Sequence, residues 1–123
     1  MQYSEKLLHY FYTATHAGTL NENNPQVKKG EVGRAAEGNV LHLYLQKENH
    51  HIVAATFLAT GPVAAIASCE FVCCWLEGRT MSDAQQITAQ AIMQTVEMPT
   101  TQFHVAVQVE RLVKKTISLL QGE

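Results

Sequence analysis

The stretch Thr60–Leu76, TGPVAAIASCEFVCCWL, constrains the fold more than any other part of this 123-residue chain. Gly61 supplies the backbone freedom of a turn, and Pro62 suits the first position of a helix, where no amide hydrogen is needed. Small and apolar residues then continue to Leu76 with a single charge, Glu70. A helix that is apolar almost all round is a buried one. We therefore expect a central helix with the rest of the chain folded around it.

The bulk numbers indicate one globular domain over residues 1–123. Hydrophobic residues make up 46% of the chain and charged residues 16%, which is ordinary for a protein with a packed core. The formal net charge of -2 provides no basic field for nucleic acid. We therefore expect no nucleic-acid partner.

The N-terminal residues MQYSEKLLHY lack the basic-then-apolar order of a signal peptide. Three cysteines, an odd number, indicate reduced thiols, so we expect a cytoplasmic location. The run from Ile52 to Cys69 carries no charge and is formally long enough to span a membrane. The Gly-Pro break within it favours a strand, a turn and a buried helix instead, with no membrane span.

Two neighbouring stretches have the pattern of strands. Residues 40–46 alternate leucines with polar or amphipathic residues, which is typical of a half-buried strand. Ile52–Ala59 is the second strand, and the polar turn between them makes the pair an antiparallel hairpin. Glu31-Val32 adds a short third strand. The residues expected to face the core are Leu41, Leu43, Leu45, Val53, Ala55 and Phe57, with His42, Tyr44 and Gln46 on the polar face.

Helices are expected both before and after these strands along the chain. Ser4 caps a first helix over Glu5–Tyr12, and Gly18–Gly30 forms a loop. Gly78 ends the central helix, Ser82 and Gln85 form a capping box for a short helix through Ile87, and another helix covers Ala89–Val96.

A long final helix follows, capped by Thr100 or Thr101. Its expected apolar stripe is Phe103, Val107, Val109, Leu112, Val113, Ile117 and Leu120. This order of elements predicts an α+β fold, in which a small antiparallel sheet of about three strands has helices packed on one face.

Several motifs in register resemble the NifU/IscU-type iron–sulfur cluster assembly scaffold family. They are Tyr3-Ser4-Glu5-Lys6, Gly33 to Val40, Thr60-Gly61 with Ala65-Ile66-Ala67-Ser68, Trp75 with Gly78, Asp83-Ala84-Gln85, and Pro99 with Phe103-His104. The resemblance covers nearly the whole chain and implies the α+β fold read from the residue pattern.

The resemblance also implies three cysteine ligands, and none of the three is present. The family's GxPACGD loop reads GRAAEGN, which places Glu37 at the thiolate position and Asn39 at the aspartate position. The family's second motif, Gly-Cys-Gly, has Pro62 in place of its cysteine in this chain. The third motif, His-Cys, is His104-Val105 here. The chaperone-recognition segment LPPVK has also lost its lysine, and the Asn-Pro-x-Asn segment reads Thr-Ala-Thr-His, ending at His16.

Iron–sulfur clusters are held by thiolates, and neither proline nor valine can replace one. We therefore expect no cofactor at these positions. The alternative is an iron, zinc or cluster site with an altered ligand set that includes Glu37 and His104.

The three cysteines, Cys69, Cys73 and Cys74, all fall in the central helix. We expect them to be small buried core residues, as free cysteines commonly are. A redox pair or a relocated ligand set is the alternative, because Cys69 and Cys73 share a helix face.

None of these thiols lies in a loop or at a helix start, where its pKa would be lowered, so we expect no enzyme activity. The sequence favours a non-catalytic paralogue that binds a protein. The resemblance suggests a cysteine desulfurase or another cluster-assembly component as that partner.

Overall fold

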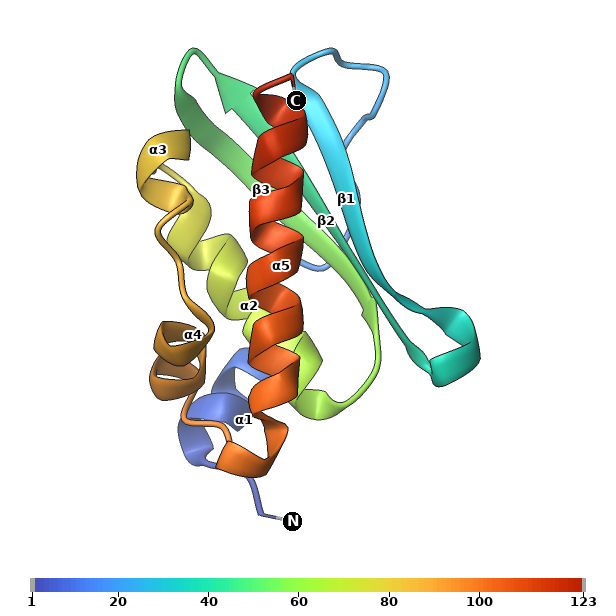
Figure 1. Ribbon diagram of the computed structural model, residues 1–123, viewed down its shortest axis with the longest axis vertical. Helices are drawn as coiled ribbons and strands as arrows, with labels where there is room; N and C mark the ends of the chain where they lie inside the picture. Colours follow the sequence, from blue (N-terminus) through green and yellow to red (C-terminus); the bar gives the residue numbers. More distant parts are fainter. Residues whose placement is uncertain (1, 123) are drawn as a thin grey trace.

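The computed structural model describes residues 2–122. A helix precedes a three-stranded sheet, and four further helices follow it (Figure 1). The elements are α1 (Glu5–Tyr12), β1 (Val27–Arg34), β2 (Asn39–Glu48), β3 (His51–Thr60), α2 (Val63–Leu76), α3 (Met81–Ala84), α4 (Ala89–Val96) and α5 (Phe103–Leu120), with short 3₁₀ turns η1 (Ala35–Glu37) and η2 (Thr100–Gln102).

The sheet is antiparallel with the order β1-β2-β3, and α2 and α5 lie on the same face of it (Figure 1). Helix α5 packs on β1 and β2, α2 packs on β3, and α1 and α4 pack against the helices. The predicted α+β fold is confirmed. None of the helices within residues 2–122 is long and apolar enough to cross a membrane.

Helix α2 occupies the centre, as its apolar sequence predicts. Ten of its fourteen residues are buried, so it meets protein on nearly every side. Pro62 is the N-cap and the helix begins at Val63, one residue later than expected. Gly78 follows the helix with φ +90°, a backbone conformation that favours glycine. The same helix buries its one charged residue, Glu70, which is 1% exposed.

The predicted strands form, but two side chains face differently from expectation. Val53 is exposed and Ile52 is buried in its place. The cause is a β-bulge: Gln46 pairs with Ala54 and Lys47 with Ile52, which leaves Val53 as the extra residue. Tyr44, expected on the polar face, is buried.

Strand β1 is longer than the two residues expected. It runs over Val27–Arg34, so the end of the predicted loop Gly18–Gly30 is strand. Eight residues of β1 pair with β2. The Pro, Gly and Asn content of this segment favoured a loop, and the pairing with β2 decided the outcome.

Two helix starts also differ from the prediction. Helix α3 is capped by Thr80, whose side chain accepts a hydrogen bond from Asp83 N at 3.1 Å, so the Ser82 capping box was wrong. The N-cap of α5 is Gln102, the last residue of the 3₁₀ turn η2, so neither Thr100 nor Thr101 caps this helix. Most of the predicted stripe of α5 is buried, but Phe103 and Val107 are exposed.

Candidate functional site

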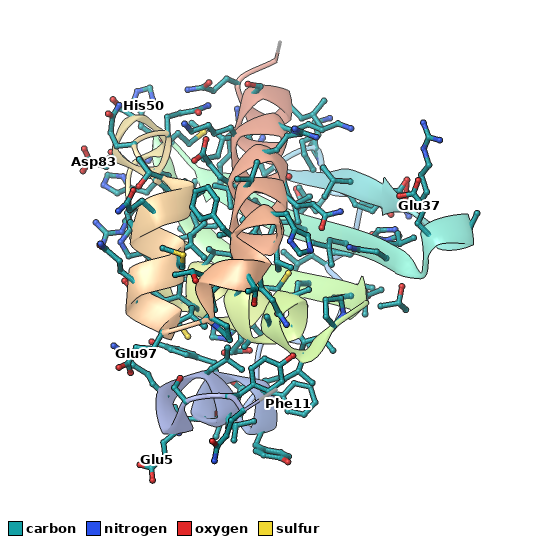
Figure 2. The ribbon with its side chains drawn as sticks, turned by 60° about the horizontal axis from the view of Figure 1, so that its bottom comes forward. Glu5, Phe11, Glu37, His50, Asp83 and Glu97 are labelled. Carbon is teal, nitrogen blue, oxygen red and sulfur yellow. The ribbon has the colours of Figure 1, made fainter. Side chains whose placement is uncertain are left out.

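Three of the residues in the family's ligand motifs, Glu37, Asn39 and His104, line a hollow between the β1–β2 connection and the start of α5. It has a volume of about 560 Å³ and is lined by Glu37, Asn39, Phe103, His104, Val107, Gln108 and Arg111. Figure 2 shows Glu37 on the β1–β2 connection, which projects from the body of the molecule. The structure therefore brings Glu37 and His104 to one surface hollow, as the altered ligand set requires.

Asn39 is one of the residues that line this hollow. Its side-chain amide donates to Gln108 Oε1 at 3.1 Å, while its own Oδ1 is buried and has no hydrogen-bond partner among the described residues. A Cβ added at Gly61 would lie 3.5 Å from that oxygen, so the turn before α2 reaches the same place. The lining of the hollow thus includes an amide, a carboxylate and an imidazole side chain, and the amide oxygen of Asn39 is buried without a partner among the described residues.

The other two positions supply no ligand. Pro62 is exposed at the start of α2, but its ring has no donor atom. Val105 is 0% exposed and belongs to the core. None of the residues that line the hollow is a cysteine. The residues present therefore do not fit an iron–sulfur cluster, whose iron is held by thiolates.

The three cysteines have two environments, where one was expected. Cys69 and Cys73 are buried as predicted, whereas Cys74 is exposed. Burial, together with the neighbouring Glu70 charge, raises the pKa of Cys69 to about 12. Burial also raises the pKa of Cys73 well above its usual value. These two thiols are therefore inert core residues.

Cys74 belongs to a second polar cluster, which the sequence analysis missed. Its Sγ lies 3.4 Å from Glu70 Oε2 and 3.8 Å from His16 Nδ1. His16 comes from the segment after α1, and its Nδ1 lies 2.6 Å from Glu70 Oε2. Glu77 approaches the other ring nitrogen, with Oε1 2.8 Å from Nε2.

Within residues 2–122, His16, Glu70 and Cys74 are the one group of three or more His, Cys, Asp or Glu residues whose ligand atoms all lie within 4.8 Å of one another. The sequence does contain a signal for the residues that α2 and its C-cap contribute to the cluster. Glu70, Cys74 and Glu77 are spaced i, i+4 and i+7, so they follow one face of an otherwise apolar helix. No local pattern could have brought His16, which is 54 residues away, to that face.

These contacts offset the desolvation cost of burying the Glu70 carboxylate. Its Oε1 accepts a hydrogen bond from the backbone amide of His16 at 2.9 Å, and its Oε2 accepts one from Thr15 Oγ1 at 3.3 Å. For His16, burial alone lowers the pKa, but hydrogen bonds to Glu77 and Glu70 and their charges outweigh burial and raise it above 6.5. A buried carboxylate persists only when it is paired in this way.

The remaining histidines lie on the surface. His42 Nε2 is 2.6 Å from Glu31 Oε1, its cross-strand neighbour on the outer face of the sheet. His50 and His51 are exposed at the β2–β3 turn, as predicted. These positions have structural explanations.

Comparison with known proteins gives one consistent result. The family model described as the NifU-like N terminal domain matches residues 2–122. The iron–sulfur cluster assembly scaffold protein IscU of Escherichia coli K12 is 30% identical over 119 residues, covering 96% of this chain and 93% of that protein. IscU of Azotobacter vinelandii is 30% identical over 118 residues, covering 95% and 92%.

A solved structure agrees on the fold. The N-terminal part of a nitrogen-fixing NifU-like protein from Brucella abortus superposes with a TM-score of 0.71 at 14% identity, covering 98% of this chain and 94% of that one. The whole described architecture is thus shared with this structure, including the sheet and the helices around it.

Proposed function

We propose a function that starts from a fixed premise: the chain belongs to the NifU-like N-terminal domain family, which includes iron–sulfur cluster assembly scaffold proteins. Within that family, we infer that this protein is a non-catalytic paralogue. It binds another protein and holds no cluster at the positions where the family resemblance places cysteine ligands.

The observation that carries this proposal is the state of those positions. Glu37 lies in the hollow, Pro62 has no donor atom, and Val105 is packed in the core. Because Val105 is fully buried, loss of the third thiol is accompanied by a side chain that contributes to packing. Val105 therefore stabilises the core at a position where a scaffold would hold the cluster with a cysteine ligand.

The surface beside the hollow supports a protein partner. Phe103 is 39% exposed and Val107 is 37% exposed, and they lie one turn apart on α5. Exposed aromatic and aliphatic side chains beside charged ones such as Arg111 are typical of protein-binding surfaces. A cysteine desulfurase is the partner class that we propose first, since the relatives are named as assembly scaffolds.

Anaerobic reconstitution with ferrous iron and sulfide tests the loss of cargo. We expect the protein to gain no cluster absorption in the visible range. The triple variant Glu37→Cys, Pro62→Cys, Val105→Cys is the informative comparison, because the shared fold should bring its thiolates together. Formation of a stable cluster on the unsubstituted protein that is lost in Glu37→Ala and in His104→Ala would contradict the proposal.

Binding to a purified cysteine desulfurase of the same organism tests the partner. Titration calorimetry should give a complex that Phe103→Glu weakens at least about tenfold. Val53→Glu is the matched control, because Val53 is 43% exposed but lies on a strand of the sheet, away from this helix. Equal weakening by both substitutions would contradict the proposed surface.

A second candidate function is metal binding in the hollow itself. The Oδ1 of Asn39, which has no hydrogen-bond partner among the described residues, favours it, because an iron or zinc ion could use this oxygen together with Glu37 and His104. Iron or zinc that remains bound during purification and is lost in both Glu37→Ala and His104→Ala would support this function over the first.

A further inference from the structure

The buried carboxylate of α2 has an arrangement that a salt bridge alone does not require. Three groups converge on Glu70 Oε2: His16 Nδ1 at 2.6 Å, Thr15 Oγ1 at 3.3 Å and Cys74 Sγ at 3.4 Å. Its other oxygen, Oε1, is held by a backbone amide. A nitrogen, an oxygen and a sulfur atom therefore surround one point at the end of a fixed carboxylate.

From this geometry, we propose that His16 Nδ1, Glu70 Oε2 and Cys74 Sγ form a binding site for a divalent transition-metal ion of the zinc class. The set of one imidazole, one carboxylate and one thiolate matches the ligand types of zinc sites. Three protein ligands leave the fourth position of a tetrahedral ion to water, which the exposure of Cys74 permits.

The separations of the ligand atoms are close to those that zinc requires. Zinc bonds of about 2.0–2.3 Å in tetrahedral geometry place the ligand atoms about 3.4–3.6 Å apart. The distances from Cys74 Sγ to Glu70 and His16 are 3.4 and 3.8 Å. Only the 2.6 Å hydrogen bond between His16 and Glu70 must lengthen, by about 0.8 Å, to admit the ion.

The groups behind the ligands already hold them in place. Glu77 Oε1 is 2.8 Å from His16 Nε2, which leaves Nδ1 as the nitrogen that faces the site. Metal-bound histidines commonly have a carboxylate on their second nitrogen. Glu77 is itself anchored, because its Oε2 accepts a hydrogen bond from Ala55 N of β3 at 3.3 Å.

The backbone fixes His16 as well. Its carbonyl accepts a hydrogen bond from Phe57 N at 3.0 Å, and the next residue, Ala17, forms a parallel bridge with Phe57. The imidazole is thus held between β3 and α2. Such support from neighbouring elements is what a site needs to bind a metal without a large ordering cost.

Charge also balances when a metal binds. The ion replaces the proton between His16 and Glu70 and the thiol proton of Cys74, and both protons leave to solvent. Two positive charges replace two protons, so the net charge of the cluster does not change. No oxidant or reductant takes part.

This site is separate from the family's ligand positions. Cys74 lies twelve residues beyond Pro62 in sequence, which is about 18 Å along the helix axis. The inference therefore goes beyond the proposed function and does not depend on it.

Titration of chelator-stripped protein with Zn²⁺ alone, and then with Co²⁺ as a spectroscopic probe, tests the site. We expect one equivalent to bind, with tetrahedral cobalt bands and a sulfur-to-cobalt charge-transfer band. Cys74→Ala, at an exposed position, should abolish the charge-transfer band and weaken zinc binding at least about tenfold. Cys73→Ala is the matched control. It removes the adjacent buried thiol and should leave the charge-transfer band and the zinc affinity unchanged.

Glu77→Gln separates the positioning residue from the ligands. It should weaken zinc binding by about 10–100-fold but keep the charge-transfer band. Circular dichroism of each variant checks that the fold is retained. Glu37→Ala and His104→Ala should have no effect on either signal.

Two results would overturn the inference. Absence of stoichiometric zinc or cobalt binding in folded protein would mean that the cluster is only a buried ion pair. Binding that survives Cys74→Ala and disappears in His104→Ala would assign the metal to the hollow instead. Cluster reconstitution, which tests the proposed function, uses different residues, so either proposal can fail without the other.

Discussion

At the scale of single residues, His16 is the side chain whose protonation matters most for stability in the metal-free protein. The ionisable groups against its ring are Glu70 and Cys74 of α2 and Glu77, the C-cap of that helix. Burial lowers the pKa of His16, but hydrogen bonds to Glu77 and Glu70 outweigh burial and raise it above 6.5. The protonated ring therefore stabilises the folded state.

The sign of the pH dependence follows from this raised pKa. The contribution is fully present below pH 6.5 and is lost as pH rises through the higher folded-state pKa. In chelator, the urea midpoint should fall from pH 6 to pH 9 by more in the unsubstituted protein than in His16→Gln. A midpoint difference that grows with pH would contradict this prediction.

Thiol reactivity should distinguish Cys74 from the two buried cysteines. Burial, the hydrogen bond to Glu70 and the charges of Glu70 and Glu77 raise the pKa of Cys74 to about 11. At pH 8, roughly one thiol in a thousand is then ionised. Labelling with iodoacetamide in chelator should be slow at pH 8 and accelerate about tenfold per pH unit up to pH 10, because the thiolate is the reactive form.

The comparison variant for this labelling is Glu77→Gln, at an exposed position. Removing its charge should speed modification of Cys74 at pH 8, since that charge contributes to the raised pKa. Cys69 and Cys73 should react only after unfolding. Mass-spectrometric detection of label on Cys73 in folded protein would show that the core is more open than described.

At the scale of elements, the capping of α3 can be tested by a pair of substitutions. Thr80 Oγ1 accepts a hydrogen bond from Asp83 N, whereas Ser82 is exposed inside the short helix. Thr80→Ala should lower the free energy of unfolding by about 1 kcal/mol. Ser82→Ala should leave it nearly unchanged, and urea unfolding measures both. A larger loss in Ser82→Ala would restore the capping box expected from sequence.

The sequence predicts elements well where one periodic pattern covers the whole element. Helix α2 and the inward leucines of β2 follow directly from apolar spacing, and both are as predicted. The misses occur where pairing between distant segments decides. The bulge at Val53 and the full length of β1 depend on register with β2, which no local signal contains.

The candidate sites show the same division. The likeness of the loop GRAAEGN to a family motif was enough to place Glu37 near His104, and the structure brings them to one hollow. The cluster around Glu70 could not be found completely, because His16 reaches it only through the packing of the segment after α1 on α2 and β3. Sequence showed one lone charge in an apolar helix but not its partners.

At the scale of the whole molecule, the contact of α5 with the sheet sets how closely the two layers approach. Gly30 of β1 faces Thr116 of α5, which is buried and donates a hydrogen bond to Leu112 O at 2.7 Å. A Cβ at Gly30 would overlap Thr116 Oγ1 and lie 3.3 Å from the Thr116 backbone. Glycine at this position therefore allows the helix to lie close to the strand.

Gly30→Ala should consequently destabilise the protein by about 1–3 kcal/mol, the usual cost of overpacking. Thr116→Ala removes the overlapping hydroxyl, so the double variant should lose less stability than the sum of the two single variants. A double-mutant cycle from urea unfolding measures this coupling. Gly38→Ala is the comparison at a glycine with no atom within 4 Å of an added Cβ, although its φ of +71° carries a backbone cost of its own. If the losses in Gly30→Ala and Thr116→Ala were strictly additive, the two layers would not be set by this contact.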